Sequence, residues 1–233
     1  MFNNRSQSGN GRSVLVLALL NGWSLSALAQ PDLEGIWEID RSLNRQYSEP
    51  DYTAEGQRRV EAYDVLTDDP SYGCIPSGLG RAWDEPDTLA KIEQYPNRVM
   101  IYYEMFDLVR TIELEQNGHP IDAPPSTINI DGVPMPTMGH SIGWYEDDAL
   151  MVETVGYARG YITTLLRFPP HSEALRSLER IYRDEEDRLV VETTYVDPII
   201  YQQPLTSTNR YLRTEFPFTV YGCVPFDVEG ETR

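Results

Sequence analysis

The chain has 233 residues, of which 40% are hydrophobic, and this is enough for one domain with a substantial core. Its formal net charge of −18 repels the phosphates of nucleic acids and anionic lipid headgroups. We therefore expect neither nucleic acid nor membrane as a partner of the mature protein.

Residues 1–29 have the organisation of a secretory signal peptide, with a positive n-region, an apolar segment at 14–20 and the cleavage signal Ala27-Leu28-Ala29. A membrane anchor is the alternative, although the apolar run is short for a span. The prediction is a periplasmic or secreted protein whose single domain covers residues 30–233. That domain carries a net charge of −20, because the two arginines of the leader are removed.

Two elements are expected early in the mature chain. Residues 33–39 alternate in the manner of a strand. Residues 53–66 predict one helix, since Thr53 can cap it, Glu55 lies in its first turn and apolar residues recur on one side.

The chain has two cysteines, Cys74 and Cys223. An oxidising compartment favours a structural disulfide between them. So long a closed loop would stabilise the fold by about 4–5 kcal/mol in the chain-entropy model. A two-cysteine metal site is not expected, because the sequence has no CxxC pair.

From residue 89 onward nearly every segment predicts strand or turn. Residues 89–94, 99–106 and 108–115 are short β-rich runs, and Asn117-Gly118 is a turn dipeptide. Residues 119–139 then contain five prolines and no periodicity. A stretch of this kind predicts a lid, a binding loop or a disordered segment.

Residues 145–154 and 182–193 resemble each other, each with an acidic turn before a strand that ends in Val-Glu-Thr. They predict the same hairpin used twice, with acidic turns that stay solvated. With final strands in 201–216 and 218–223, the count reaches nine or ten. The predicted fold is all-β, an antiparallel barrel closed on itself with one N-terminal helix and a long proline-rich loop; a sandwich is the alternative.

Gly35-x-Trp37 on the first strand resembles the G-x-W that opens the lipocalin and calycin barrels. That resemblance implies a tryptophan packed across the barrel floor, with a late arginine, Arg210 or Arg213, lying over it. It also implies that one small ligand is held in the barrel mouth.

His140 and His171 follow loops in the same way, each preceding a serine. Glu173 lies two residues after His171, so on a strand both side chains face one way, and a carboxylate raises the basicity of an imidazole. If both loops open at one barrel end, the two histidines meet over the cavity. The alternative for His140 is a loop histidine bonded to a backbone carbonyl, and the alternative for His171 is a surface ion pair or a hydrogen bond within its loop. Fifteen tyrosines exceed the needs of a core, and the substrate-binding candidates are Tyr102, Tyr103, Tyr157, Tyr161 and Trp144.

Two other chemistries have weaker support. His119 could complete a three-histidine metal site, but no two histidines have short ligand spacing, so no metal is expected. Gly139-His140-Ser141-Ile142-Gly143 fits G-x-S-x-G, but a serine hydrolase elbow needs strand–turn–helix and a hairpin follows here. Walker A and Rossmann motifs are absent, and we expect no cofactor.

Several stretches are similar to a widespread family of exported bacterial proteins of undefined function. They are the GHSIG segment 139–154, the PHSEAL segment 170–180, Asp197-Pro198, Cys74-Ile75-Pro76-Ser77-Gly78 and Tyr221-Gly222-Cys223. The resemblance implies that the family pattern includes His140, His171, Glu173, Glu179, Arg180 and both cysteines. The departure is the proline-rich stretch 119–137, which would set a distinct substrate.

The expected function is that of a secreted, cofactor-free enzyme of lyase, isomerase, cyclase or hydratase type, acting on a small organic molecule in the barrel cavity. His171 would be the base and His140 the acid. The alternatives are a periplasmic small-molecule binding protein without catalysis and, third, a metal-dependent or serine hydrolase.

Overall fold

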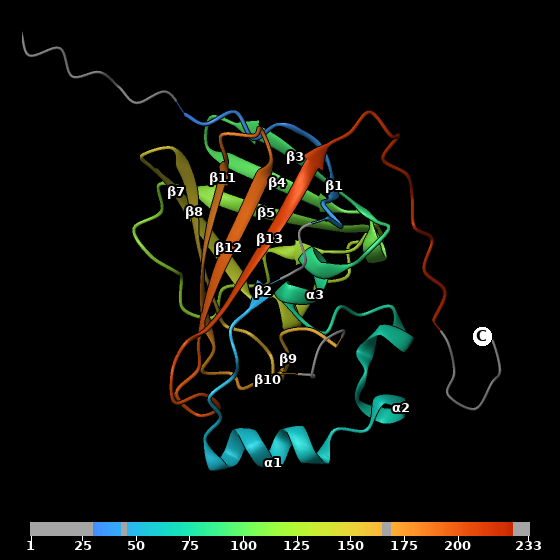
Figure 1. Cartoon of the computed structure of the whole chain (residues 1–233), viewed down its shortest axis with the longest axis vertical. Helices are drawn as coiled ribbons and strands as arrows, with labels where there is room; N and C mark the ends of the chain where they lie inside the picture. Colours follow the sequence, from blue (N-terminus) through green and yellow to red (C-terminus); the bar gives the residue numbers. More distant parts are fainter. Residues whose placement is uncertain (1–29, 43–45, 165–168, 226–233) are drawn as a thin grey trace, which may run out of the picture.

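The computed structural model describes residues 30–42, 46–164 and 169–225. The predicted signal peptide at 1–29 lies outside these residues. Within them, nine strands close into a β-barrel, because the first strand pairs with the last (Figure 1). Around the wall they are β1 (Gly35–Ile39), β3 (Leu89–Tyr95), β4 (Arg98–Tyr103), β5 (Leu108–Leu114), β7 (His140–Glu146), β8 (Ala149–Val155), β11 (Arg176–Arg183), β12 (Leu189–Val196) and β13 (Leu205–Arg213). The predicted closed β-barrel is therefore confirmed.

The barrel is mixed, and in this the prediction of an antiparallel barrel is wrong. Strands β5 and β7 run parallel, with Glu113 opposite Ile142, whereas the other neighbouring pairs of the wall are antiparallel. Parallel neighbours cannot be joined by a tight hairpin, so the chain needs a long connection between them. The proline-rich stretch 119–139 lies in that connection. It contains β6 (Thr127–Ile128), which pairs with β5, and a 3₁₀ turn, η3 (Pro136–Met138).

The two predicted repeated hairpins are confirmed as β7–β8 and β11–β12. They also pair with each other through β8 and β11, and together they form one continuous side of the barrel. Buried and exposed positions alternate along these strands, so the β-branched and apolar residues fill the interior and the acidic turns face solvent.

Trp37 of β1 is fully buried, and the guanidinium of Arg213 lies 4.6 Å from the centre of its ring. The prediction of a late arginine over this tryptophan is confirmed for Arg213. Gly35 explains the close approach, because it has a φ of +135° and a Cβ there would lie 2.5 Å from the Arg213 guanidinium. This cation–π contact stabilises the pairing of β1 with β13, which closes the barrel.

The predicted helix 53–66 is divided in two. Helix α1 (Ala54–Ala62) begins at the expected cap, since the Thr53 side chain accepts from the Gly56 amide, but it ends before Tyr63. Asp64 then caps the short helix α2 (Val65–Asp68), and a 3₁₀ turn, η1 (Pro70–Gly73), follows. Asp64 favours a new helix start over continuation, because its side chain satisfies a backbone amide of the next turn. Figure 1 shows α1 across the lower end of the barrel, beside the short strand pair β9 (Gly160–Tyr161) and β10 (Pro170–His171).

Helix α3 (Leu79–Asp84), which the sequence analysis missed, is inserted among the inner faces of the barrel, and all six of its residues are buried. Trp83 donates to Glu179 of β11 at 2.8 Å and packs edge-on against Tyr103 of β4. Asp84 accepts from Asn209 of β13 at 3.0 Å. The interior is thus filled by a helix that is bonded to three parts of the wall.

A buried ion pair lies beside this helix. Arg110 of β5 and Glu179 are both fully buried and form two hydrogen bonds, of 3.1 and 2.5 Å. Arg110 also donates to the hydroxyls of Ser141 and Thr154. Burial disfavours the charged guanidinium, but the attraction of Glu179 outweighs this, and the pKa of Arg110 is raised. The charge is therefore held inside the barrel by a nearly complete set of partners.

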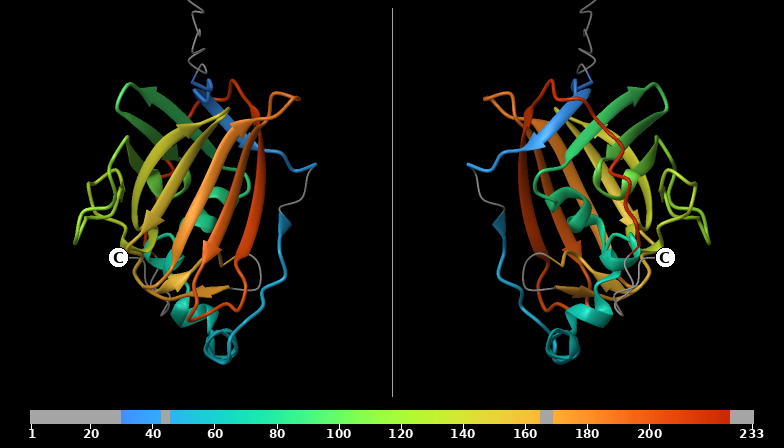
Figure 2. Two further views of the ribbon diagram at one scale, coloured as in Figure 1. Left: turned by 90° about the vertical axis from the view of Figure 1, so that its left-hand side faces the viewer. Right: turned by 90° about the vertical axis from the view of Figure 1, so that its right-hand side faces the viewer.

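The chain end is tied back to the segment that precedes α3. The predicted disulfide is formed between Cys74 and Cys223, 149 residues apart. Figure 2 shows the segment after β13 following the outside of the barrel. In this segment the amides of Tyr221 and Gly222 donate to the Asp107 carboxylate. Asp107 belongs to η2 (Met105–Asp107), a 3₁₀ turn that precedes β5.

The short strand β2 (Gln46–Tyr47) lies outside the closed wall and pairs with Ser207 and Thr208 of β13. Among the described helices, none is long and apolar enough to cross a membrane.

Candidate functional site

The candidate site is built around His171, the last residue of β10. Its side chain is fully buried, and its ring packs edge-on against Tyr157, with 5.5 Å between the ring centres. Nδ1 lies 3.1 Å from the carbonyl oxygen of Ser172. Since a carbonyl oxygen only accepts, Nδ1 holds the proton of the neutral ring, and Nε2 is left with its lone pair.

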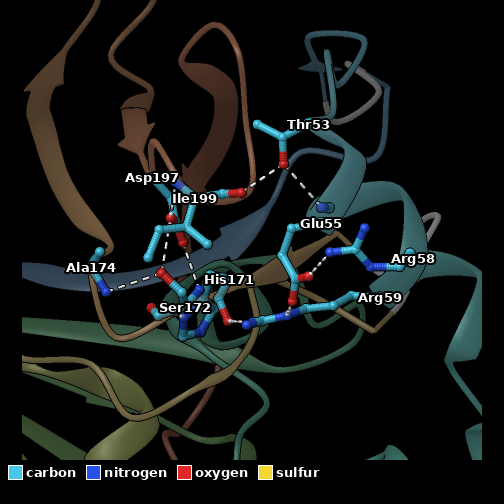
Figure 3. Close-up of polar contacts among 10 residues, drawn as sticks. Thr53, Glu55, Arg58, Arg59, His171, Ser172, Ala174, Asp197 and Ile199 are labelled. Atoms are coloured by element: carbon cyan, nitrogen blue, oxygen red, sulfur yellow. Dashed lines mark hydrogen bonds and ion pairs between the residues drawn. The ribbon is translucent and has the colours of Figure 1, made fainter.

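The backbone on both sides of this imidazole is held by charged groups (Figure 3). The carboxylate of Asp197 accepts from the backbone amide of Ser172 at 2.6 Å and from its hydroxyl at 2.9 Å. Arg59 of α1 donates to the carbonyl oxygen of His171 at 3.1 Å. These charge-assisted bonds fix the backbone that carries the ring, whose tautomer is set by the Ser172 carbonyl.

The predicted partner of His171 is different in the structure. Glu173 is exposed and lies in a turn, because β10 ends at His171 and the alternation of a strand no longer applies. The group that orients the ring is the Ser172 carbonyl, and the buried carboxylate nearby is Asp197. The prediction that Glu173 orients the base is therefore corrected.

Nε2 of His171 is buried and has no hydrogen-bond partner among the described residues. Burial lowers the pKa of this histidine to about 4, and the opposing effects of the Ser172 carbonyl and Asp197 offset only part of it. At neutral pH the ring is therefore uncharged. It presents a nitrogen that can accept a hydrogen bond or a proton.

A cleft of about 300 Å³ lies against the strand pair β9–β10. Gly160 of β9, which faces His171 across the pair, and Pro170, which precedes it, both line this cleft. The imidazole thus lies directly behind the cleft wall. The complete lining is Arg59, Asp68, Pro70, Ser77, Thr137, Arg159, Gly160, Tyr161 and Pro170. The volume suits a small ligand, since it is at the lower end of the range for small-molecule sites.

Ser77 brings a second unpartnered polar group to the cleft. It is fully buried, and among the described residues its hydroxyl has no hydrogen-bond partner. The segment fits closely against β9: the Tyr161 amide donates to the Ser77 carbonyl at 3.4 Å, and a Cβ on Gly78 would lie 2.4 Å from the Tyr161 carbonyl oxygen. A buried hydroxyl without a partner costs about 1–3 kcal/mol, which a ligand that bonds to it would offset.

Gly160 lies between the imidazole of His171 and the backbone of Ser77. A Cβ at this position would lie 3.3 Å from Nε2 of His171 and 3.0 Å from the carbonyl oxygen of Ser77. A side chain would therefore fill the space in front of the imidazole. The absence of one leaves Nε2 separated from the cleft by a backbone strand alone.

His140 is paired with His119. Their Nδ1 atoms are 2.7 Å apart, and Nε2 of His119 lies 3.4 Å from Glu153 of β8. Burial, followed by the neighbouring charge of His119, lowers the pKa of His140. The predicted pairing of His140 with His171 is thus replaced by one with His119. The cause is the parallel pairing of β5 and β7, which places Leu114 at the end of β5 opposite Gly143 near the start of β7, so that His119, five residues after Leu114, lies close to His140.

The five aromatic candidates lie in different surroundings. Tyr161 lines the cleft and packs edge-on against Tyr63; Tyr157 is buried, contacts His171 and shares a short hydrogen bond with Ser177. The remaining three are distributed over both faces of the barrel wall: Tyr103 is buried against Trp83, Tyr102 bonds to Glu93 on the outer face, and Trp144 bonds to Glu146. The structure therefore brings only Tyr157 and Tyr161, of these five, to the region of His171.

The metal and serine alternatives meet the following geometry. Among the described residues, no group of three or more His, Cys, Asp or Glu side chains has an arrangement that could hold a metal ion. Ser141 lies inside β7, where its hydroxyl is bonded to Arg110 and to Thr154. A fully buried strand residue with two partners does not have the setting of a nucleophile elbow.

A second cleft of about 300 Å³ is lined by Glu38, Ile39, Arg41, Asp87, Thr88, Leu89, Glu104 and Phe216. Arg41 forms an ion pair with Asp87 there, and no histidine contributes to the lining. Its charged groups are acidic apart from this paired arginine. We therefore place the candidate site at the cleft beside His171.

Comparison of the chain with protein-family models and with curated proteins finds no match. The site is therefore interpreted from its own geometry. Sequence reasoning found His171, but it did not assign Ser77, Gly160, Arg59 or Arg159 to the site. A signal existed for Ser77, which belongs to the motif at Cys74–Gly78 noted above.

Proposed function

We propose that this protein is an exported enzyme that performs proton-transfer chemistry, of lyase, isomerase, cyclase or hydratase type, on a small organic molecule bound in the cleft beside β9 and β10. His171, which lies behind Gly160 and does not itself line the cleft, accepts the proton through Nε2 once the backbone of β9 at Gly160 moves aside. The observation that carries the proposal is the buried Nε2 behind a cleft that is lined in part by Ser77; among the described residues, neither this nitrogen nor the buried Ser77 hydroxyl has a hydrogen-bond partner. A buried polar group without a partner in a native structure calls for an explanation, and a bound ligand is one; a histidine with a strongly shifted pKa beside a cleft points to a functional site.

The low pKa of His171 sets a requirement on this chemistry. A general base works best when its pKa is near the operating pH, and a value of about 4 is well below neutrality. A negative charge on the bound substrate raises the pKa of a nearby imidazole. His171 therefore becomes an effective base when an anionic substrate occupies the cleft.

In this proposal His140 has a different role from the one expected. Its contact with His119 fastens the long connection between β5 and β7 to the barrel wall. We assign His140 to that fastening, and Glu173 to no catalytic role, since it is exposed in a turn.

Export and kinship with lipocalin-like barrels belong to the same proposal. The Cys74–Cys223 disulfide supports residence in an oxidising compartment. The closure of the barrel by β1 and β13, with Arg213 over Trp37, supports the resemblance to the G-x-W barrels. The filled interior moves the proposed ligand site from the barrel mouth to the cleft at its end.

The alternative is a binding protein that uses the same cleft without turnover. A neutral imidazole with a pKa of about 4 is a good hydrogen-bond acceptor and a weak base, and this favours binding if the ligand carries no charge.

Proton transfer can be tested before the substrate is known. The protein is incubated in D₂O with a small-molecule extract of its host's periplasm, and mass spectrometry identifies compounds that gain carbon-bound deuterium. The control is His171→Asn, whose amide can still donate to the Ser172 carbonyl but which lacks Nε2. We expect label with the wild type and none with the variant. Equal labelling by both would exclude His171 as the base, and a retained ligand without label would identify a binding protein.

A further inference from the structure

The charges around the cleft differ from those of the rest of the molecule. The whole chain carries a net charge of −18, whereas the cleft lining contains two arginines, Arg59 and Arg159, and one carboxylate, Asp68. At formal charges, two positive groups and one negative group give the lining a net charge of +1. A locally positive cleft on an acidic protein attracts one negative charge and disfavours two.

The positive charge of Arg59 is not cancelled by its ion pair. Glu55 accepts from Arg59 at 2.9 Å and from Arg58 at 2.5 Å, so one carboxylate is shared between two guanidinium groups (Figure 3). Including Arg58 and Glu55 therefore leaves the net charge of the cluster at +1. Arg59 is also fixed in place by its bond to the His171 carbonyl, which prepares it to bind an anion without losing much side-chain freedom.

The remaining lining indicates what else the ligand carries. Ser77 presents a buried hydroxyl without a partner among the described residues, and this hydroxyl can donate to an oxygen of the ligand. Pro70, Pro170 and the ring of Tyr161 provide apolar surface. The volume of about 300 Å³ limits the ligand to a small molecule.

We propose that the cleft binds a small organic monocarboxylate, with its carboxylate at Arg59 and Arg159, a carboxylate oxygen or hydroxyl at Ser77 and its carbon skeleton against Tyr161 and the two prolines. The inference rests on the proposed function in taking this cleft as the substrate site. Planar guanidinium groups match both carboxylates and phosphates. A dianionic phosphate, however, would exceed the single positive charge of the lining and would face Asp68.

The test is calorimetric titration of the whole protein with three pairs of probes of matched shape: acetate and acetamide, L-lactate and L-lactamide, benzoate and benzamide. Inorganic phosphate is a further probe. We expect saturable binding of at least one carboxylate. The matched amide should bind at least about tenfold more weakly, as for the loss of one charge-assisted hydrogen bond.

The variants Arg159→Gln and Ser77→Ala should each lower the affinity for that carboxylate about tenfold. Arg98→Gln, which removes a positive charge at the start of β4 outside the cleft, should leave its affinity unchanged. Thermal unfolding of each variant checks that it is folded. The proposal is overturned if no carboxylate binds, if an amide binds as well as its carboxylate, if phosphate binds more tightly, or if Arg159→Gln has no effect.

Failure of this inference and failure of the proposed function give different results. If a carboxylate binds through Arg159 but gains no deuterium in D₂O, the inferred ligand class stands and the proposed enzyme function fails. If a neutral compound gains deuterium with the wild type and not with His171→Asn, the proposed enzyme function stands and the inferred ligand class fails.

Discussion

Replacing Glu179 with glutamine removes the negative charge at the centre of the barrel and leaves Arg110 without its counterion. The carboxylate of Glu179 accepts from Arg110 at 3.1 and 2.5 Å and from the indole of Trp83 at 2.8 Å. Both members of the ion pair are fully buried, so water cannot replace the lost partner. The substitution keeps the size of the side chain, and the effect therefore isolates the charge.

Breaking a buried ion pair by removing one partner costs about 3–5 kcal/mol. For a chain of 233 residues, this corresponds to a fall in Tm of roughly 6–20 °C. The free energy of unfolding is measured by urea denaturation at pH 7, followed by tryptophan fluorescence, because Trp83 contacts the altered group. Because Trp83 anchors α3, and α3 follows Ser77, the variant should also lose affinity for any ligand of the cleft.

Two further variants make this prediction specific. Glu186→Gln removes an exposed carboxylate and should change the free energy of unfolding by less than about 0.5 kcal/mol. The double variant Arg110→Met/Glu179→Leu removes both charges and should be more stable than Glu179→Gln alone. The reasoning fails if Glu179→Gln costs less than about 1 kcal/mol, or if the double variant is the less stable of the two.

Three more predictions concern stability. Cys74→Ser/Cys223→Ser should lower the free energy of unfolding by about 2–5 kcal/mol in urea denaturation, and an effect below 1 kcal/mol would show that the 149-residue loop adds little. Thr53→Ala should cost about 1 kcal/mol by loss of the helix cap, whereas Thr53→Ser should retain it; equal losses in both would exclude capping as the cause. The pKa of His171 is lowered to about 4 in the folded protein, so the unfolded chain binds more protons between about pH 6.5 and 4. Stability should therefore be full above pH 6.5 and fall by up to about 3 kcal/mol as the pH drops through this range, and the fall should be smaller in His171→Asn; identical pH profiles would contradict the assignment.

Much of the fold could be predicted because its signals are local. The two hairpins of β7–β8 and β11–β12 have alternating strands and acidic turns that are visible within about a dozen residues. The parallel pair β5–β7 could not be predicted, because pairing direction depends on contacts between distant segments. The long proline-rich stretch predicts a lid, a binding loop or a disordered segment, although a parallel neighbour also requires such a connection.

The site was predicted in part, and for a similar reason. His171 was found by residue type, but its surroundings come from three distant segments, at Ser77, Gly160 and Asp197. The spacing of His171 and Glu173 suggested a strand, and a strand that ends at the histidine turns the glutamate away. Helix α3 was missed because six residues are too few to show a helical period.

The central claim is that His171 is neutral, with its proton on Nδ1 and Nε2 available to a ligand. Nitrogen-15 NMR of the imidazole at pH 7, with His171→Asn used to assign the signals, tests this directly. The account predicts a protonated Nδ1 and a bare Nε2 in the free protein, and a shift of the Nε2 signal when the carboxylate found by titration is added. A protonated Nε2 in the free protein, or an Nε2 signal that does not respond to the bound carboxylate, would contradict it.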